Sequence, residues 1–535
     1  MAEYDYIIVG AGSAGSVLAN RLTEDDRASV LVLEAGGHDL SPWIHMPIGY
    51  GMAYYDSTIN WKYTTLPVPG LEGKTSYWPR GKVLGGSSSI NAMVYVRGNP
   101  SDFDDWGAVA PGWAWDDVAP VFRRMERWAG PPSQERGAHG PLHVNDISGE
   151  VHPLCYKYLE GARQAGLPVT SDYNGAEFEG ASLYQITTHG GFRASTARCY
   201  LRPALRRRGL RLETRAHVER LSFAGTRCTG VRYSRGGVSR QARARREVIL
   251  SAGAVNTPQI LQLSGIGPGA VLQRNGIETR RDLPVGRHLQ DHFGVDFHYV
   301  SRVPTLNQVL RPWLGKIRVG LQYLATRRGP LSLSINQGGG FVRTREDLET
   351  PNLQLYFSPV SYTRAPAGKR AMMSPDPFPG FLLGYCTCRP TSEGWIEIAS
   401  PNAHDAPAIQ PNYLATEHDI SEAIEAARFI RRLASAPAIA EMIERVIHPT
   451  DEATSDADLE AHIRGTGWTV FHPSCTARMG RDPKSSVVGP DLKVHGIEGL
   501  RVADASAFPN ITSGNINAPV IMLAERAADI IQAGA

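Results

Sequence analysis

A glycine-rich turn near the N-terminus restricts the fold of this chain more than any other feature of its sequence. Residues 4–9 (YDYIIV) form a short apolar, β-branched run, and residues 10–15 (GAGSAG) follow at once. Residues 16–22 continue with helical spacing, and a second apolar run, residues 30–33, ends on Glu34. This order is the pattern of a Rossmann-like dinucleotide-binding unit: a strand, a glycine turn, a helix and a second strand that ends on an acidic residue.

Each position in this unit has a physical task. Gly10 permits the tight turn, Gly12 lets a pyrophosphate approach the backbone, and Gly15 lets the helix pack closely on the strand. The N-terminus of the helix offers free N–H groups to phosphates, and Glu34 is suited to accept hydrogen bonds from a ribose diol. This unit alone does not distinguish NAD from FAD. We expect the dinucleotide to contact Gly10, Gly12, Ser13, Ala14, Gly15, Glu34 and Ala35.

A second glycine-rich block, residues 79–95 (PRGKVLGGSSSINAMVY), holds a glycine pair and a serine run among apolar residues. Small side chains and free backbone N–H groups suit a second loop around a diphosphate and a flat ring. On its residues alone, the block is also compatible with a nest for another anion or with a tight surface loop.

Two polar segments near the C-terminus are candidates for chemistry. Residues 471–480 (FHPSCTARMG) place His472 directly before a proline, and residues 513–519 (SGNINAP) precede a helical segment, residues 520–531. Pro519 suits the first turn of that helix, and Asn517 suits its N-cap. A lone histidine is more often a structural or surface residue than a catalytic one, so His472 by itself does not define an active site.

Two stretches resemble the signatures of a known family, the glucose–methanol–choline (GMC) flavoprotein oxidoreductases. Residues 81–104 are similar to the first signature, and residues 253–267 (GAVNTPQILQLSGIG) are similar to the second. A predicted strand, residues 247–251, precedes the second stretch, as the family pattern requires. The N-terminal turn and the C-terminal segments extend the resemblance over the whole chain. It is nearest to the choline-dehydrogenase-like and the aryl-alcohol or hydroxymethylfurfural-oxidising branches.

The resemblance implies an α/β fold in which a Rossmann-like FAD-binding domain is interleaved with an α+β substrate-binding domain built on an antiparallel sheet. The FAD-binding domain would gather residues 1–40, 75–110, 200–300 and 480–535. The substrate-binding domain and lid segments would take residues 41–74, 111–199 and 301–479. Residues 384–398 alternate like strands and residues 419–433 have helical spacing, in agreement with this outline. Residues 301–340 have room for a helical lid.

The resemblance also implies the contacts of the cofactor, FAD. Val218 matches the valine whose backbone contacts the adenine, although strand core is an alternative for this residue. Asp504 and Ala505 match a contact near the ribityl chain, although Asp504 could equally be a turn acid. Some relatives attach FAD covalently through a histidine at the position of Ile90, so non-covalent FAD is expected here. The remaining expected contacts are Arg80, Val83, Gly85, Gly86, Ser87, Asn91, Ala92, Met93, Val94, Ala252, Asn517, Pro519 and Val520.

The family pattern places the catalytic base at His472 and its partner at Asn515. A neutral imidazole, with an ordinary pKa of about 6.5, is suited to remove a hydroxyl proton near neutral pH, and the Asn515 amide can hold the substrate oxygen. The leading hypothesis is oxidation of a primary alcohol to an aldehyde by hydride transfer to flavin N5, with O2 or another electron acceptor. The alternatives are a non-redox or photochemical use of the scaffold, as in hydroxynitrile lyase or fatty-acid photodecarboxylase, and a catalytically idle binding protein.

Composition excludes several other classes. The chain has 56 Lys and Arg against 53 Asp and Glu, a net charge of +3 that does not indicate nucleic acid. Its six cysteines lack the spacing of a zinc site, and we expect no metal and free thiols in a reducing compartment. No apolar run approaches the roughly 20 residues of a membrane span, and a strand so near the N-terminus leaves no room for a signal peptide. A cytoplasmic protein is therefore expected.

The identity of the alcohol and the oligomeric state stay open at this point. A choline substrate would require an aromatic cage and a carboxylate for its ammonium group. Aromatic side chains in the substrate domain are more often core or apolar wall, which would favour an aryl or aliphatic alcohol. The candidates for a cage are Trp61, Tyr63, Trp313, Tyr356 and Phe357.

Overall fold

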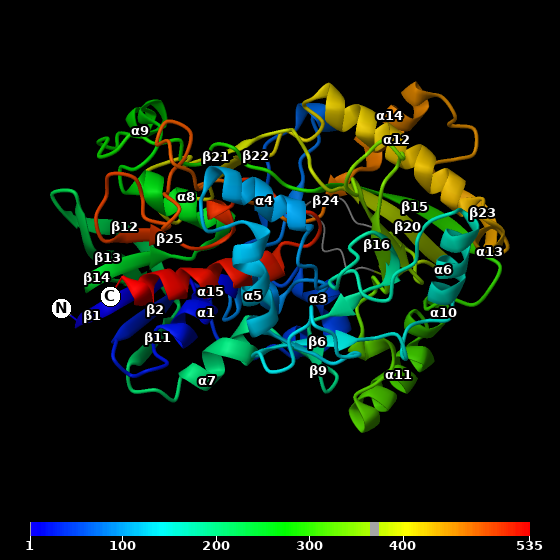
Figure 1. The fold of residues 1–535 in the computed structure, drawn as a ribbon, viewed down its shortest axis with the longest axis horizontal. Helices are drawn as coiled ribbons and strands as arrows, with labels where there is room; N and C mark the ends of the chain where they lie inside the picture. The colour runs from blue at the N-terminus through cyan, green and yellow to red at the C-terminus, as the bar shows by residue number, and fades with distance from the viewer. Residues whose placement is uncertain (1, 364–373, 535) are drawn as a thin grey trace.

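The N-terminal strand lies at the centre of a mixed seven-stranded sheet in the computed structural model, which describes residues 2–363 and 374–534 (Figure 1). The strand order is β11-β2-β1-β14-β13-β12, and β25 also pairs with β14. The parallel strands are β1 (Ala2–Val9), β2 (Val30–Glu34), β11 (Leu210–Thr214), β14 (Val238–Leu250) and β25 (Leu500–Val502), and the antiparallel ones are β12 (Ala216–Ala224) and β13 (Arg227–Arg235). The predicted dinucleotide-binding unit is confirmed as β1, α1 and β2.

The first and last helices of the chain pack on each other against this sheet. The helix α1 (Ser13–Arg21) follows the glycine turn, and α15 (Asn517–Ala533) ends the chain beside it (Figure 1). Arg21 joins them through ion pairs with Glu525 and Asp529. Because α15 has sheet or helix on most of its circumference, its residues are apolar nearly all round. The two ends of the chain thus complete one core.

The second lobe is built on another seven-stranded sheet, of order β23-β15-β20-β17-β16-β7, in which β24 also pairs with β15 and all the ladders are antiparallel. Its strands are β7 (Gly180–Leu183), β15 (Phe293–Ser301), β16 (Gly338–Val342), β17 (Leu353–Ser358), β20 (Gly380–Thr387), β23 (Ile443–His448) and β24 (Trp468–Thr469). The helices α6 (Leu154–Gln164) and α12 (Glu417–Ala434) pack against it.

Successive side chains of β17 point in turn to the helix-covered face of this sheet and to the face that forms a wall of the functional site. Phe357 stacks on Tyr158 of α6 at a ring distance of 5.0 Å. Tyr356, its neighbour in the strand, lines the large cavity between the lobes. Successive side chains of a strand point to opposite faces, so one face of the sheet packs on helices and the other forms a cavity wall.

The predicted fold class is confirmed: a Rossmann-like α/β lobe is combined with a lobe built on an antiparallel sheet. The exact domain limits stay a prediction. The structure adds that β15 begins inside the range 200–300, and its ladder partners all belong to the antiparallel sheet. Residues 293–301 therefore group with the second lobe.

Several predicted segments correspond to observed elements. Residues 384–398 contain the end of β20 and β21, residues 419–433 lie in α12, and residues 301–340 contain α10 and α11. The expected N-cap at Asn517 is wrong, because α15 begins at this residue and its side chain instead accepts a hydrogen bond from Ser13 Oγ at 2.8 Å. All six cysteines are free thiols. Within residues 2–363 and 374–534, no helix has the length and apolarity of a membrane span, and no cluster of potential ligands could hold a metal.

The remaining helical elements are α2 (Pro42–His45), η1 (Pro47–Gly49), α3 (Tyr50–Ala53), η2 (Pro69–Leu71), η3 (Gly86–Ser89), α4 (Pro100–Val109), α5 (Trp115–Met125), the π-helical η4 (Ala197–Leu201), α7 (Arg202–Ala204), α8 (Gly253–Leu263), α9 (Gly269–Arg274), α10 (Asn307–Leu310), α11 (Trp313–Thr326), η5 (Pro330–Ser332), α13 (Pro437–Ala440), α14 (Asp456–Thr466) and η6 (Ala505–Ala507). The remaining strands are β3 (Tyr63–Thr64), β4 (Tyr77–Trp78), β5 (Glu126–Trp128), β6 (Leu142–Asp146), β8 (Gln185–Ile186), β9 (Thr188–His189), β10 (Phe192–Arg193), β18 (Tyr362–Thr363), β19 (Ser374–Pro375), β21 (Trp395–Glu397) and β22 (Ala408–Gln410).

Candidate active site and dinucleotide cradle

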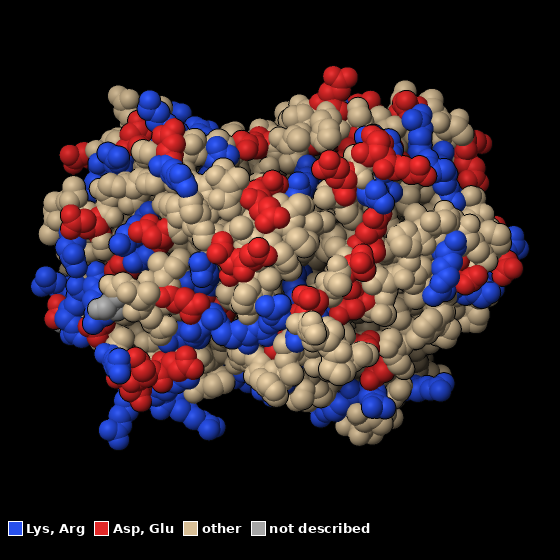
Figure 2. Space-filling view, in the orientation of Figure 1, with Lys and Arg blue, Asp and Glu red and all other residues tan. Residues whose placement is uncertain are grey.

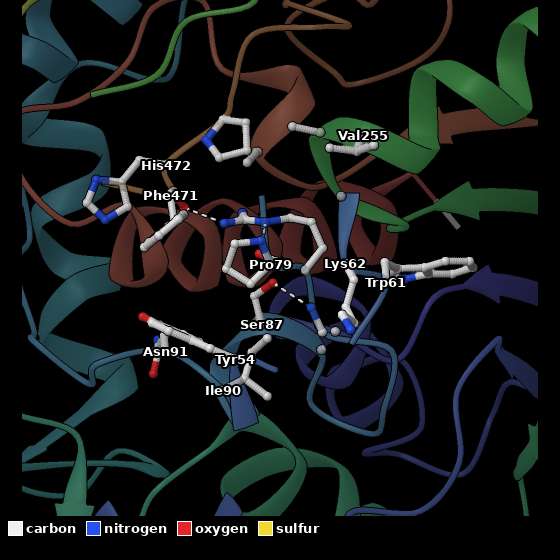
Figure 3. Close-up of a pocket in the computed structure, with 18 of the residues that line it drawn as sticks. Tyr54, Trp61, Lys62, Pro79, Ser87, Ile90, Asn91, Val255, Phe471 and His472 are labelled. Atoms are coloured by element: carbon white, nitrogen blue, oxygen red, sulfur yellow. Dashed lines mark hydrogen bonds between the residues drawn. The ribbon is translucent and has the colours of Figure 1, made fainter. Parts of the chain in front are cut away.

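A cavity of about 1150 Å³ extends from the glycine turn after β1 to the two C-terminal polar segments. Figure 3 shows part of it, with Phe471 and His472 on one side and Ile90 and Asn91, from the second glycine-rich block, on another. Most of the predicted site residues line it: Gly10, Gly12, Ser13, Ala14, Glu34, Ala35, Arg80, Gly86, Ser87, Asn91, Ala92, Met93, Val94, Val218, Ala252, His472, Asp504, Ala505, Asn515, Asn517 and Val520.

The two glycine-rich blocks meet at one end of this cavity. Gly86 has φ +52°, and a Cβ there would lie 2.7 Å from the Gly12 Cα. Gly10 has φ +98°, and a Cβ there would lie 2.5 Å from the Ser251 carbonyl oxygen. The helix α1 has no side-chain cap at its N-terminus, so its first N–H groups are available to an anion. These features fit a diphosphate held between two backbone loops.

Glu34, at the end of β2, is held in place beside this cradle. Its two carboxylate oxygens accept hydrogen bonds from the backbone N–H groups of Ala11 and Gly36, each at 2.8 Å. Burial raises the pKa of this carboxyl to about 7. Each oxygen retains a lone pair, which is the arrangement required to bind the hydroxyls of a ribose.

Asp504 lines the cavity, but its carboxylate is surrounded by protein donors. One oxygen accepts from Gly253 N at 2.9 Å and Thr257 Oγ1 at 2.6 Å, and the other from the backbone N–H and hydroxyl of Ser506. This carboxylate therefore joins the start of α8 to η6, which favours the interpretation as a turn acid for its side chain.

Four of the predicted contacts do not line the cavity: Gly15, Val83, Gly85 and Pro519. Gly15 packs behind the turn, where a Cβ would lie 1.9 Å from the Gly10 carbonyl oxygen. Val83 is buried in a small apolar cluster with Ile44, Ala53 and Ile90. Gly15 and Val83 therefore contribute to packing beside the cavity rather than to its surface.

His472 lies on the loop after β24 and is buried between three polar partners. Its backbone N–H donates to Asp291 Oδ1 at 2.6 Å. Its Nε2 is 3.1 Å from Asn515 Nδ2, and its Nδ1 is 2.9 Å from the Nδ1 of His292. The two imidazole rings are nearly perpendicular, at 87°. The structure thus brings together the predicted pair His472 and Asn515 and adds His292.

The partners of His292 define the position of the proton on His472. His292 Nε2 is 3.0 Å from the Cys388 carbonyl oxygen, which can only accept, so Nε2 carries the hydrogen. Burial lowers the pKa of His292 to about 4, so its Nδ1 is an unprotonated acceptor at neutral pH. The proton between the two rings therefore belongs to His472 Nδ1. The Nε2 of His472 is left unprotonated at the cavity and accepts a hydrogen bond from Asn515 Nδ2 at 3.1 Å.

The electrostatic surroundings keep His472 neutral. Burial lowers its pKa well below the ordinary value, and the nearby His292 and Arg80 lower it further. Arg80 lines the cavity and donates to the backbone carbonyls of Phe471 and Pro79 at 2.7 and 2.5 Å. Burial raises the pKa of the neighbouring Asp291 to about 6. The imidazole of His472 is therefore neutral over the physiological pH range.

The amide of Asn515 is oriented by a second buried network. Its Oδ1 accepts from Gln354 Nε2 at 3.0 Å, and Gln354 also contacts the hydroxyls of Tyr184 and Tyr356. Since the oxygen is occupied, the NH2 group faces His472 Nε2 and the cavity. The sequence analysis did not identify His292 or Gln354, because both lie far along the chain from residues 472 and 515 and no local motif marks them. The one signal was the polar cluster of residues 288–292, which directly precedes a strand.

The five aromatic residues considered for an ammonium cage do not form one cage, although Trp61 and Tyr63 stack on each other at a ring distance of 5.8 Å. Trp61 and Tyr356 line the cavity, whereas Phe357 is part of the core and Trp313 is 69% exposed on α11. The aromatic wall near the base is instead formed by Tyr54, Phe471 and Trp468, with ring distances of 5.5 and 5.8 Å to the central Phe471.

Known proteins resemble this chain over its whole length. Residues 4–294 and 390–524 match the N- and C-terminal family profiles of GMC oxidoreductase. Mitochondrial choline dehydrogenase of Mus musculus is 42% identical over 99% of this chain and 89% of its own length. Alcohol dehydrogenase [acceptor] of Pseudomonas putida is 40% identical over 99% and 95%. Pyridoxine 4-oxidase from Mesorbium loti has a similar structure, with 31% identity, a TM-score of 0.88 and coverage of 98% of each chain.

Family and geometry agree. The two glycine loops form the cradle that an FAD diphosphate requires, and the family consists of FAD flavoproteins whose similar members act on alcohols. The chain belongs to the GMC oxidoreductase family and is an FAD-dependent oxidoreductase that acts on CH–OH groups.

Proposed function

We propose that the protein oxidises a primary alcohol to an aldehyde and that His472 Nε2 removes the hydroxyl proton. The observation that carries this proposal is the hydrogen-bond chain from the Cys388 carbonyl through His292 to His472, which leaves a lone pair on Nε2 at the cavity. Bound FAD would supply the acceptor for the hydride that leaves the alcohol carbon. Loss of the hydroxyl proton to a base strengthens that hydride donation.

Asn515 and His472 would bind the substrate oxygen together. The Asn515 NH2 group, oriented by Gln354, donates a hydrogen bond to the alcohol oxygen, while Nε2 accepts the hydroxyl proton. These two nitrogens are now hydrogen-bonded to each other at 3.1 Å, so an alcohol oxygen that replaced this bond would be near both. Fixing the oxygen at two points aligns the alcohol before reaction.

We further propose that FAD is held without a covalent bond. Ile90, which lines the cavity at the position of covalent attachment in some relatives, has no nucleophilic atom. The glycine turn and η3 would hold the diphosphate, and Glu34 would hold the ribose. The N-terminal end of α15, beside Asn517, would place a positive dipole near the flavin ring.

An uncharged alcohol with an apolar or aromatic body fits the cavity better than choline. The carboxylates that line it are Glu34 and Asp504, which are held by backbone donors of the dinucleotide cradle, and Asp56. Asp56 is turned toward the backbone and hydroxyl of Thr58. Near His472 the charged group that lines the cavity is instead the cation of Arg80, because the carboxyl of Asp291, which accepts from the His472 backbone N–H, does not line it. A quaternary ammonium group would therefore meet aromatic rings but also a like charge.

Rapid anaerobic mixing with a panel of alcohols tests these assignments. We expect benzyl and medium-chain alcohols to bleach the flavin absorbance faster than choline does. His472→Ala should retain FAD and reduce the bleaching rate by roughly 10²- to 10⁴-fold, the usual contribution of a general base. An unchanged rate in this variant would refute the role of His472, and fast reduction by choline alone would refute the proposed substrate class.

A further inference from the structure

The helix α11 exposes a row of large apolar side chains on the lobe opposite the termini (Figure 1). The exposed fractions are 69% for Trp313, 62% for Leu314, 50% for Ile317, 63% for Leu321 and 65% for Leu324. At 3.6 residues per turn, the spacing of these five positions places them within one face of the helix. An exposed apolar face of this size is unusual on a monomeric protein and indicates an interaction site.

The opposite face of α11 already attaches the helix to the protein. Val319 and Tyr323 are buried, and the Tyr323 hydroxyl donates to the Gly191 carbonyl at 2.9 Å. Tyr323 also packs edge-on against Phe192 of β10. The outer apolar row is therefore not needed for the core of the protein, and it is held in a fixed orientation.

Basic residues surround this row. Arg311, Lys316, Arg318, Arg327 and Arg328 lie on or beside α11, whereas residues 297–345 include no aspartate or glutamate. In the rest of the chain the two charges are nearly balanced. One acid approaches from a neighbouring segment, Glu150, which is 3.8 Å from Arg328. Figure 2 shows the result as a tan protrusion at the lower right with Lys and Arg side chains on both sides.

We propose that α11 is an interfacial helix that docks the protein on an anionic lipid bilayer. An apolar face with Trp and Leu, flanked by Lys and Arg, is the pattern of helices that lie in the plane of a membrane surface. The row enters the acyl boundary and the cations contact lipid phosphates. A second copy of the chain fits less well, because a symmetric contact would place five cations against five others.

Docking through α11 would also orient the cavity. The helix packs on η5, and residues Ile335 and Asn336, which follow η5, line the cavity. One wall of the cavity thus lies on the membrane side of the molecule, which suits an alcohol or an electron acceptor that partitions into lipid. The docking itself does not depend on which alcohol is oxidised.

Co-sedimentation of the holoenzyme with lipid vesicles tests the proposal. At low ionic strength we expect binding to vesicles of phosphatidylcholine and phosphatidylglycerol in equal parts, and little binding to pure phosphatidylcholine. The double variant Leu321→Ser, Leu324→Ser should lower the partition coefficient by about tenfold or more, because each leucine loses buried apolar area. Lys316→Glu should weaken binding to the anionic vesicles and lower its sensitivity to salt, because less of the binding then depends on charge attraction.

Val238→Ser provides the matched control, because Val238 is 57% exposed on β14 of the other lobe. It should bind vesicles as the wild type does. Flavin absorbance and alcohol-driven bleaching should be unchanged in the double variant, which separates docking from catalysis. Equal binding of the wild type and the double variant would overturn the proposal. A second outcome would also overturn the proposal. If the wild type sediments as a dimer, the double variant sediments as a monomer and neither binds vesicles, the exposed face of α11 is the contact with a second copy of the chain.

Discussion

Replacement of His292 by phenylalanine provides the sharpest test of how the proposed base, His472, is held in its reactive tautomer. The phenyl ring matches the imidazole in size but removes the Nδ1 acceptor, which lies 2.9 Å from His472 Nδ1. It also removes the hydrogen bond to the Cys388 carbonyl. His292 contacts neither the cavity nor the substrate directly, so we class it as a positioning residue that acts through His472.

The size of the effect follows from the buried partners. In the variant, a proton on His472 Nδ1 would be buried without an acceptor, at a cost of about 1–3 kcal/mol. Moving the proton to Nε2 avoids this cost but removes the lone pair that faces the cavity. The reactive tautomer is therefore disfavoured by about 1–3 kcal/mol, and flavin reduction should be slower by roughly 5- to 150-fold.

Two measurements distinguish positioning from simple damage to the fold. Anaerobic stopped-flow absorbance gives the rate of flavin reduction. Nitrogen-15 spectra of histidine-labelled protein report which nitrogen of His472 carries the proton, and we expect Nδ1 in the wild type and a shift toward Nε2 in His292→Phe. The matched variant His292→Asn places an amide oxygen near the former Nδ1 and should recover most of the rate. Wild-type rates in His292→Phe, or equal losses in both variants, would refute the tautomer argument.

Three further predictions concern the cofactor and the stability of the protein. Gly86→Ala should lose most of its FAD, seen in the ratio of visible to ultraviolet absorbance, because its Cβ would collide with the facing glycine turn; Gly73→Ala, at φ +75° with open space around it, should retain FAD. Acid precipitation should release all the flavin into the supernatant, since Ile90 cannot form a covalent link; flavin that stays in the pellet would contradict this. Burial lowers the pKa of His292 from 6.5 to about 4. Between pH 6.5 and pH 4, this histidine is therefore protonated in the unfolded chain and neutral in the folded protein. The free energy of unfolding should therefore fall as pH drops through this window, and His292 should contribute about 2 kcal/mol of the fall between pH 7 and pH 5. In urea unfolding, the His292→Phe variant should lose less stability over this range, because it lacks the contribution of His292.

The sequence predicted those parts of the protein that depend on neighbouring residues in the chain. The run from residue 4 to Glu34 forms a complete βαβ unit. Its strands, glycine turn and helix depend on residues close together in the chain, so the dinucleotide-binding fold could be predicted from this run. Asn517 shows the limit of this reasoning. As a polar residue before a helical segment it looked like an N-cap, but α15 begins at this residue and its side chain bonds to Ser13, 504 positions away. A long-range partner competed with the local role.

The sequence by itself therefore determined the dinucleotide-binding unit, and its resemblance to the GMC signatures predicted the fold class, the FAD cofactor and the candidate pair His472 and Asn515. Only the tertiary structure decided which nitrogen of His472 carries no proton, because that depends on His292, 180 positions away, and on the carbonyl of Cys388. It also decided the orientation of the Asn515 amide and the exposure of the outer face of α11. Periodicity and short motifs report on contacts between neighbours in the chain. Proton positions and exposed faces depend on contacts between distant segments, which form only when the two lobes are assembled.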